Sequence, residues 1–180
     1  MLLDARRSLL LVVDVQQALL PAMADPDRVA RGAAILMKAA SRLEIPVLVS
    51  EQYPKGLGPT VPELAALAPA GSVLAKLHFS CVDDPALGAR LRRSGRDQVV
   101  LAGIEAHVCV LQTALGLRAA GFAPFVAADA TASRTEASHR TAMARLGAGG
   151  VAVGNVEMVV FEWLNRAGTP AFKDLSPLIK

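Results

Sequence analysis

The chain has 180 residues, of which 53% are hydrophobic and 19% are charged. This length predicts a single domain over residues 1–180, and the apolar fraction predicts a large core together with a buried subunit interface. The 19 Lys and Arg residues exceed the 16 Asp and Glu residues only slightly and form no long basic run. We therefore expect no nucleic-acid partner and no membrane-surface role.

The N-terminal segment "MLLDARRSLLLVVDV" contains a short apolar run that Asp14 interrupts, without a small-residue cleavage site. We therefore expect neither a signal peptide nor a membrane span. The two cysteines, Cys81 and Cys109, then indicate the reducing cytoplasm. The sequence alone does not decide whether Cys81 and Cys109 form a disulfide.

Apolar, β-rich runs alternate with segments of helical period along the whole chain. Both faces of each run are apolar, which is typical of parallel strands covered by helices on two sides. The sequence thus predicts an α/β sandwich with six strands, and a loop over 50–64 that forms a wall of any site at the carboxyl edge of the sheet. The predicted strands are 8–15, 45–50, 71–76, 97–103, 121–129 and 150–155, and the predicted helices are 27–44, 84–94, 107–120 and 135–148.

Three polar residues stand at the carboxyl ends of different predicted strands: Asp14, Lys76 and Cys109. Each has an ordinary interpretation when taken alone. Asp14 suits a helix cap or turn, Lys76 a solvated strand end, and Cys109 a small core residue. Because the carboxyl ends of parallel strands meet at one edge of a sheet, we expect the three side chains to converge there.

Such a cluster suits nucleophilic catalysis. A helix start and a nearby lysine both favour the thiolate, which is the reactive form of cysteine. An aspartate within reach can take the thiol proton and return it to a leaving group. The amides of the first helical turn can hold an oxyanion.

The segments "LLLVVDVQQALLP", "AKLHFSC" and "GIEAHVCVLQTALGLRAAGFAPFVAADATASR" resemble the isochorismatase-like hydrolase family, also called the cysteine hydrolase superfamily. The resemblance implies a three-layer α/β/α, Rossmann-like sandwich with a six-stranded, mainly parallel sheet in the order 3-2-1-4-5-6. It also implies a catalytic triad of Asp14, Lys76 and Cys109. By the same resemblance, the peptide bond between Ile104 and Glu105 is cis, and the N–H groups of Glu105 and Cys109 form an oxyanion hole.

Departures from the family pattern narrow these expectations. Family members that cleave isochorismate generally lack the cysteine, so Cys109 favours acyl chemistry on an amide. The nicotinamidase branch carries an Asp-x-His metal motif where this chain reads "SEQYPKGLGPT". We therefore expect no metal and no cofactor. The closest similarity is to an uncharacterised branch whose substrates are largely undefined.

Further candidates for substrate contact are Gln17, Tyr53, Phe79 and His107, although a solvated Gln and core aromatics are the ordinary interpretations. Glu105 suits a substrate contact and an exposed turn equally well. His107 is the best placed of the three histidines, since His78 and His139 lie far from it in sequence. The apolar stretches at 160–165 and 169–180 have little sheet left to cover, so we expect them to pack on a neighbouring subunit.

The leading hypothesis is thus a metal-independent cysteine hydrolase that acts on an amide or related C–N bond of a small molecule, as a homo-oligomer (dimer or higher). One alternative is a non-catalytic member of the same fold that binds a metabolite or serves as a scaffold. Another is hydrolysis of a thioester or a non-amide C–N bond. The substrate itself stays open.

Overall fold

The computed structural model describes residues 2–179, so Met1 and Lys180 at the ends of the predicted domain lie outside it. Its six strands form one sheet in the order β3-β2-β1-β4-β5-β6, and every pair of neighbours is parallel. The predicted fold class and strand order are confirmed, and the sheet is wholly rather than mainly parallel. The strands are β1 (Ser8–Val13), β2 (Val47–Gln52), β3 (Val73–Lys76), β4 (Gln98–Ile104), β5 (Ala123–Ala132) and β6 (Ala152–Gly154).

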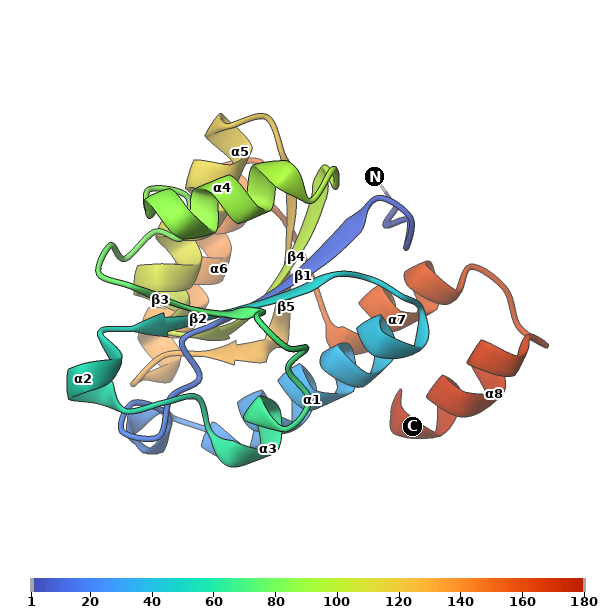
Figure 1. The fold of residues 1–180 in the computed structure, drawn as a ribbon, viewed down its shortest axis with the longest axis horizontal. Coiled ribbons are helices and arrows are strands. Elements are labelled where there is room, and N and C mark those ends of the chain that lie inside the picture. The colour runs from blue at the N-terminus through green and yellow to red at the C-terminus, as the bar shows by residue number, and fades with distance from the viewer. Residues whose placement is uncertain (1, 180) are drawn as a thin grey trace.

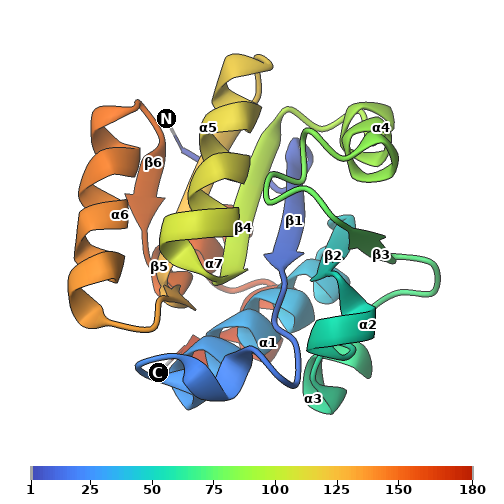
Figure 2. The same cartoon turned by 90° about the vertical axis from the view of Figure 1, so that its left-hand side faces the viewer.

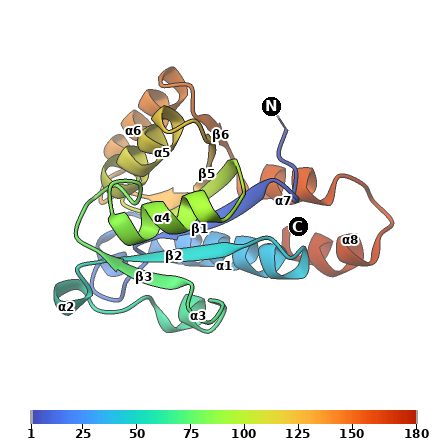
Figure 3. The ribbon, with the colours of Figure 1, turned by 45° about the horizontal axis from the view of Figure 1, so that its top comes forward.

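Helices cover the sheet on both sides, as Figure 1 and Figure 3 show. One layer holds α4 (Pro85–Arg93), α5 (Leu111–Ala119) and α6 (Glu136–Ala148); the other holds α1 (Pro26–Arg42) and α7 (Val156–Leu164). Two separate clusters of buried apolar side chains fill the spaces between these layers and the sheet. The central strand β1 is buried along its whole length, as a strand covered on both faces requires.

The starts of α1, α4, α6 and α7 are each fixed by a short polar side chain, whereas α5 continues directly from the turn before it. Asp25, Asp84, Thr135 and Asn155 accept hydrogen bonds from first-turn amides of α1, α4, α6 and α7. Such caps each contribute about 1 kcal/mol by satisfying amides that the helix leaves unpaired. The predicted helix bounds agree with the observed ones to within a few residues.

The segment predicted as a loop over 50–64 is more ordered than expected. Strand β2 continues to Gln52, and the short helices α2 (Pro54–Leu57) and α3 (Pro62–Ala65) follow it. Proline stands at the first position of each short helix, where its missing N–H costs nothing. Figure 2 places both helices beside the ends of β2 and β3.

The C-terminal segment has packing partners within its own chain. Helix α8 (Pro170–Leu175) and the 3-10 turn Ser176–Ile179 pack against the apolar cluster on the side of the sheet that carries α1 and α7. Leu175 is 3% exposed, and the ring of Phe172 lies 6.5 Å from that of Phe161 on α7. The expectation that this segment packs on a neighbouring subunit stays a prediction.

No helix within residues 2–179 combines the length and the apolar character needed to cross a membrane.

Candidate active site

The predicted triad lies at the carboxyl edge of the sheet, where the strand order reverses. Val13 at the end of β1 pairs with Gly103 of β4 on one side and with Ser50 of β2 on the other. Open parallel sheets bind ligands at such a reversal, because the helices after the two central strands leave in opposite directions. Asp14 follows β1 directly, and Cys109 lies in the helical turn that follows β4.

The close approach of β1 and β4 depends on Gly103. Its φ angle is +115°, and a Cβ atom there would lie 2.0 Å from the carbonyl oxygen of Val13. Only glycine fits this position, so the ends of the two strands, and with them Asp14 and Cys109, come together.

Lys76 and Asp14 form a buried ion pair. Lys76 Nζ donates to Asp14 Oδ2 at 2.7 Å, and both side chains have 0% exposed surface. Nζ also donates to Gln52 Oε1 at 2.6 Å and to the carbonyl oxygen of Phe79 at 3.2 Å. These three acceptors occupy all three ammonium hydrogens, so Lys76 acts through its charge rather than as a proton donor. Burial lowers the pKa of Lys76, but Asp14, Cys81 and Cys109 together outweigh it and the net shift is upward.

The second oxygen of Asp14 accepts a hydrogen bond from a serine that the sequence analysis overlooked. Ser50 Oγ donates to Asp14 Oδ1 at 2.7 Å, and Ser50 is fully buried. Asp14 itself has a φ of +52°, a left-handed conformation that short polar residues tolerate best. The carboxylate is thus held by one charged and one neutral donor.

Cys109 is 5% exposed, and its thiol lies close enough to Asp14 for that carboxylate to shift its pKa. Burial raises the pKa of the Cys109 thiol far above its ordinary value, and the negative charge of Asp14 raises it further. Lys76 offsets these effects only in part. The direction is opposite to the expectation that a helix start and a lysine would favour the thiolate, because burial and the neighbouring carboxylate outweigh the charge of Lys76.

The second thiol, Cys81, is free like Cys109, and burial raises its pKa to about 11. Its backbone N–H donates to Thr113 Oγ1 at 2.9 Å. The structure therefore contains two buried thiols near Asp14 and no disulfide between them.

The segment around Ile104 and Glu105 forms the wall of the site next to Cys109. The Ile104–Glu105 peptide bond is cis. The turn Ala106–Val110 is a π-helix that runs directly into α5, so Cys109 lies within a wide turn at the start of a helical segment. The side chain of Glu105 accepts a hydrogen bond from Arg134 Nε at 2.9 Å.

The other residues predicted to contact substrate differ in their exposure and in their hydrogen-bond partners. His107 Nδ1 lies 2.9 Å from Ser133 Oγ. This contact connects the turn that carries Cys109 to the residue after β5. Tyr53 and Phe79 are 52% and 53% exposed, so neither is a core aromatic. Tyr53 lines a cavity of about 420 Å³ that also includes Lys76. The side chain of Gln17 is exposed.

The residue next to Gln17 is the one that organises the site. Gln16 is fully buried, and its amide donates to the carbonyl oxygens of Gln52 and Gly58 at 2.9 and 2.7 Å. Its Oε1 accepts from the N–H of Gln52 at 2.7 Å. Gln52 Nε2 donates to the carbonyl of Leu77, which turns Gln52 Oε1 toward Lys76. The polar run "SEQ" at the end of β2 was the available signal for Ser50 and Gln52, but it was interpreted as part of a loop.

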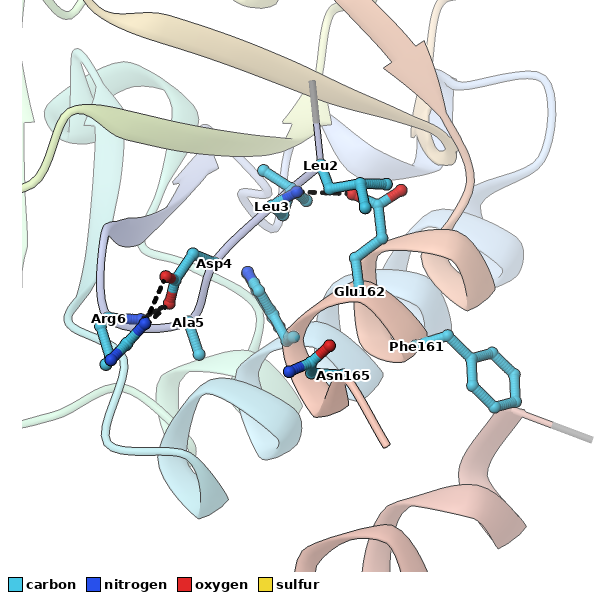
Figure 4. A pocket seen from close by; sticks show the side chains of 9 residues that line it. Leu2, Leu3, Asp4, Ala5, Arg6, Phe161, Glu162 and Asn165 are labelled. Carbon is cyan, nitrogen blue, oxygen red and sulfur yellow. Dashed lines mark hydrogen bonds and ion pairs between the residues drawn. The ribbon is translucent and has the colours of Figure 1, made fainter. Parts of the chain in front are cut away.

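A larger cavity of about 740 Å³ lies at the opposite end of the sheet, where the chain enters β1 (Figure 4). Its polar groups pair with one another: Asp4 with Arg6, and Glu162 with the N–H of Leu3. Its described lining contains no cysteine, serine or lysine. Within residues 2–179, no group of three or more His, Cys, Asp or Glu side chains is arranged to hold a metal ion.

Comparison with known proteins identifies the class to which this fold and site belong. The Isochorismatase domain family matches residues 8–158, so the chain belongs to the isochorismatase family, whose members are generally hydrolases.

Among individual relatives, the chain is 38% identical to mouse Isochorismatase domain-containing protein 2A over 176 residues, covering 96% of this chain and 82% of the relative. The structure of MAR1 ribonuclease from Caenorhabditis elegans is similar with a TM-score of 0.93 and 32% identity, covering 99% of this chain and 92% of that one. The YcaC gene product of Escherichia coli, an octameric hydrolase of unknown specificity, is similar with a TM-score of 0.93 and 26% identity, covering 99% and 90%.

Proposed function

We propose that this protein is a cysteine hydrolase that cleaves an amide or related C–N bond of a small molecule through a thioester intermediate. Asp14, Lys76 and Cys109 are the catalytic residues. The observation that carries the proposal is the buried carboxylate of Asp14, which pairs with Lys76 Nζ at 2.7 Å and lies near enough to the Cys109 thiol to raise its pKa. The chemistry uses side chains, backbone amides and water.

In the resting site the thiol is protonated and the Asp14–Lys76 pair is charged, in keeping with the raised pKa values of Cys109 and Lys76. Attack therefore couples two events: Cys109 Sγ bonds to the carbonyl carbon while its proton passes to Asp14. Asp14 then gives that proton to the leaving nitrogen, and the C–N bond breaks to leave a thioester. Delaying ionisation until attack avoids placing an unpaired thiolate beside a carboxylate.

Deacylation reverses the proton path. A water molecule attacks the thioester carbon and passes a proton to Asp14. The acid product leaves, and the proton returns to Cys109. The N–H groups of Glu105 and Cys109 are the proposed donors to the oxyanion in both steps, and amides aimed at such a charge typically contribute 10²–10³-fold to rate. Lys76 returns Asp14 to its charged form after each proton transfer, because the ion pair favours the carboxylate.

Substrate contacts are proposed for Gln17, Tyr53, Phe79 and His107 at the rim of the site. Tyr53 and Phe79 present half-exposed rings there, and His107 approaches Ser133 beside the turn that carries Cys109. An acyl group with an apolar portion suits these rings. A polar group on the substrate suits His107.

We also propose that the chain, a single domain, acts in the cytoplasm as a homo-oligomer of two or more copies. The E. coli relative is described as octameric. In addition, Tyr53, Leu77 and Phe79 are 52%, 70% and 53% exposed, which is unusual for apolar side chains gathered near one edge of a sheet. Sedimentation velocity at micromolar concentration tests this part, and a monomer would contradict it.

A panel of small amides, esters and thioesters tests the activity itself, with an RNA oligonucleotide included because the C. elegans relative is named a ribonuclease. We expect hydrolysis of at least one amide, and an acyl adduct on Cys109 that hydroxylamine releases and mass spectrometry detects. Cys109→Ala abolishes both, whereas Arg118→Gln, on the far side of α5, retains them. Turnover that survives in Cys109→Ala contradicts the cysteine mechanism. Binding of a metabolite without turnover of any compound favours the non-catalytic alternative.

A further inference from the structure

A group of buried polar side chains lies behind Asp14 and has no part in the proposed reaction. Ser50, Cys81 and Thr113 are each 0% exposed and come from β2, from the segment after β3 and from α5. Ser50 Oγ donates to Asp14 Oδ1 at 2.7 Å, and Thr113 Oγ1 accepts from the backbone N–H of Cys81 at 2.9 Å. Ser50 thus contacts Asp14 directly, while Thr113 holds the backbone of Cys81.

The direction of these hydrogen bonds follows from counting protons. The Ser50 hydroxyl has one hydrogen, which it donates to Asp14, so its oxygen is left to accept. Burial raises the pKa of the Cys81 thiol to about 11, although the nearby hydroxyls of Ser50 and Thr113 lower it, so the thiol keeps its proton near neutral pH. Cys81 can therefore donate to Ser50, which leaves the serine hydrogen committed to Asp14.

We propose that Ser50 is a positioning residue of the active site, and that Cys81 orients the Ser50 hydroxyl toward Asp14. This inference rests on the proposed function. A donor to a carboxylate favours its charged form, so Ser50 stabilises the form of Asp14 that acts as the base. Together, Ser50 and Lys76 fix both carboxylate oxygens and hence the orientation of the carboxylate toward Cys109.

The competing explanation is that Ser50 merely satisfies its own buried hydroxyl. The chain offers a matched control, because Ser72 is also buried, at 3% exposed, and its hydroxyl has no hydrogen-bond partner among the described residues. Ser72 lies just before β3, so Ser72→Ala deletes a comparable buried hydroxyl that does not contact Asp14.

The test is the pH dependence of Cys109 alkylation by iodoacetamide between pH 4 and pH 9, with the adduct located by peptide mass mapping. In Ser50→Ala we expect the acid limb of the profile to move up by about one pH unit, which is about a tenfold loss of rate on that limb. The rate on the plateau changes less than about threefold. Ser50→Thr, which keeps a hydroxyl, restores the original limb.

For Cys81→Ala, which removes the donor to Ser50, we expect the acid limb to move to higher pH by a smaller amount. For Cys81→Ser, which keeps a donor at this position, we expect no movement of the limb. Thermal melts of every variant separate loss of structure from a change in the limb. Ser50→Ala profiles that coincide with those of Ser72→Ala overturn the inference. If at the same time Asp14→Asn still slows alkylation, the proposed function stands and only the role of Ser50 fails; if Asp14→Asn has no effect, the proposed function fails first.

Discussion

Lys76 and Asp14 are 62 positions apart in the chain, yet their charged atoms lie 2.7 Å apart with both side chains fully buried. Such a pair is costly to bury and is a weak source of stability compared with apolar packing. Its retention in the core, within hydrogen-bonding reach of a thiol, fits a catalytic role better than a structural one.

Breaking this pair destabilises the protein strongly. Lys76→Met leaves the Asp14 carboxylate buried without its partner, and we expect a loss of about 3–5 kcal/mol in the free energy of unfolding. Asp14→Asn has an effect of the same direction. The double variant loses less than the sum of the two, since it leaves no unpaired charge. Urea denaturation measures all three, with Glu136→Gln on the exposed face of α6 as a control; additive losses would mean that the two groups do not interact.

Gln16 ties the segment 52–60 to the end of β1 beside Asp14. Gln16→Ala removes three hydrogen bonds from that segment, so we expect faster trypsin cleavage after Lys55, by about tenfold, and a loss of about 1–3 kcal/mol in stability. Gln17→Ala is the matched control, because that side chain is exposed. Equal cleavage rates in the two variants would show that Gln16 does not order this segment.

The C-terminal tail stabilises the single chain. Leu175→Ala removes a side chain buried against the core, and we expect a loss of about 2–4 kcal/mol. The exposed pair between Asp174 and Arg42 contributes little, so Asp174→Asn changes stability by less than about 1 kcal/mol. The effect of Leu175→Ala is independent of protein concentration if the tail packs within its own chain. A loss that grows on dilution would instead support the intersubunit packing expected from the sequence.

His139 makes stability depend on pH. Burial lowers the pKa of His139 below its ordinary value of 6.5, and the charge of Arg28 lowers it further, although the carbonyl oxygen of Ala128 partly offsets both. The folded state therefore favours the neutral ring. Its contribution is complete above pH 6.5 and is lost as the pH falls below that value toward the folded-state pKa. We expect the unfolding free energy of the wild type to fall more steeply between pH 7 and pH 5 than that of His139→Gln. Parallel curves would exclude this role.

The sheet could be predicted from the sequence because every strand is an apolar run between helical segments. The ends of the strands were less well predicted. Strand β2 runs two residues beyond the expected boundary, to Gln52, because its polar last residues still pair with β3. The packing of the tail within its own chain was not predicted, since sequence periodicity does not reveal which outer helix faces are left uncovered.

At the site, the residue types and strand-end positions of Asp14, Lys76 and Cys109 carried the prediction. Ser50 and Gln16 were missed because a buried serine or glutamine has no periodic signature, and its partners are set by the tertiary structure. The state of the Cys109 thiol was predicted in the wrong direction. The sequence indicated the nearby lysine, but it could not show that the thiol is 5% exposed or that Asp14 pairs with Lys76 at 2.7 Å.

The most direct test of the account is the rate of Cys109 alkylation by iodoacetamide at pH 7 in the wild type and in Asp14→Asn, both in a Cys81→Ser background. If Asp14 acts only through its charge, removing it lowers the pKa of the thiol and speeds the reaction, since that charge raises the pKa of Cys109. If Asp14 is the base, alkylation slows by about tenfold or more. We predict the slower rate; a faster or unchanged rate in a folded Asp14→Asn variant would contradict the proposed mechanism.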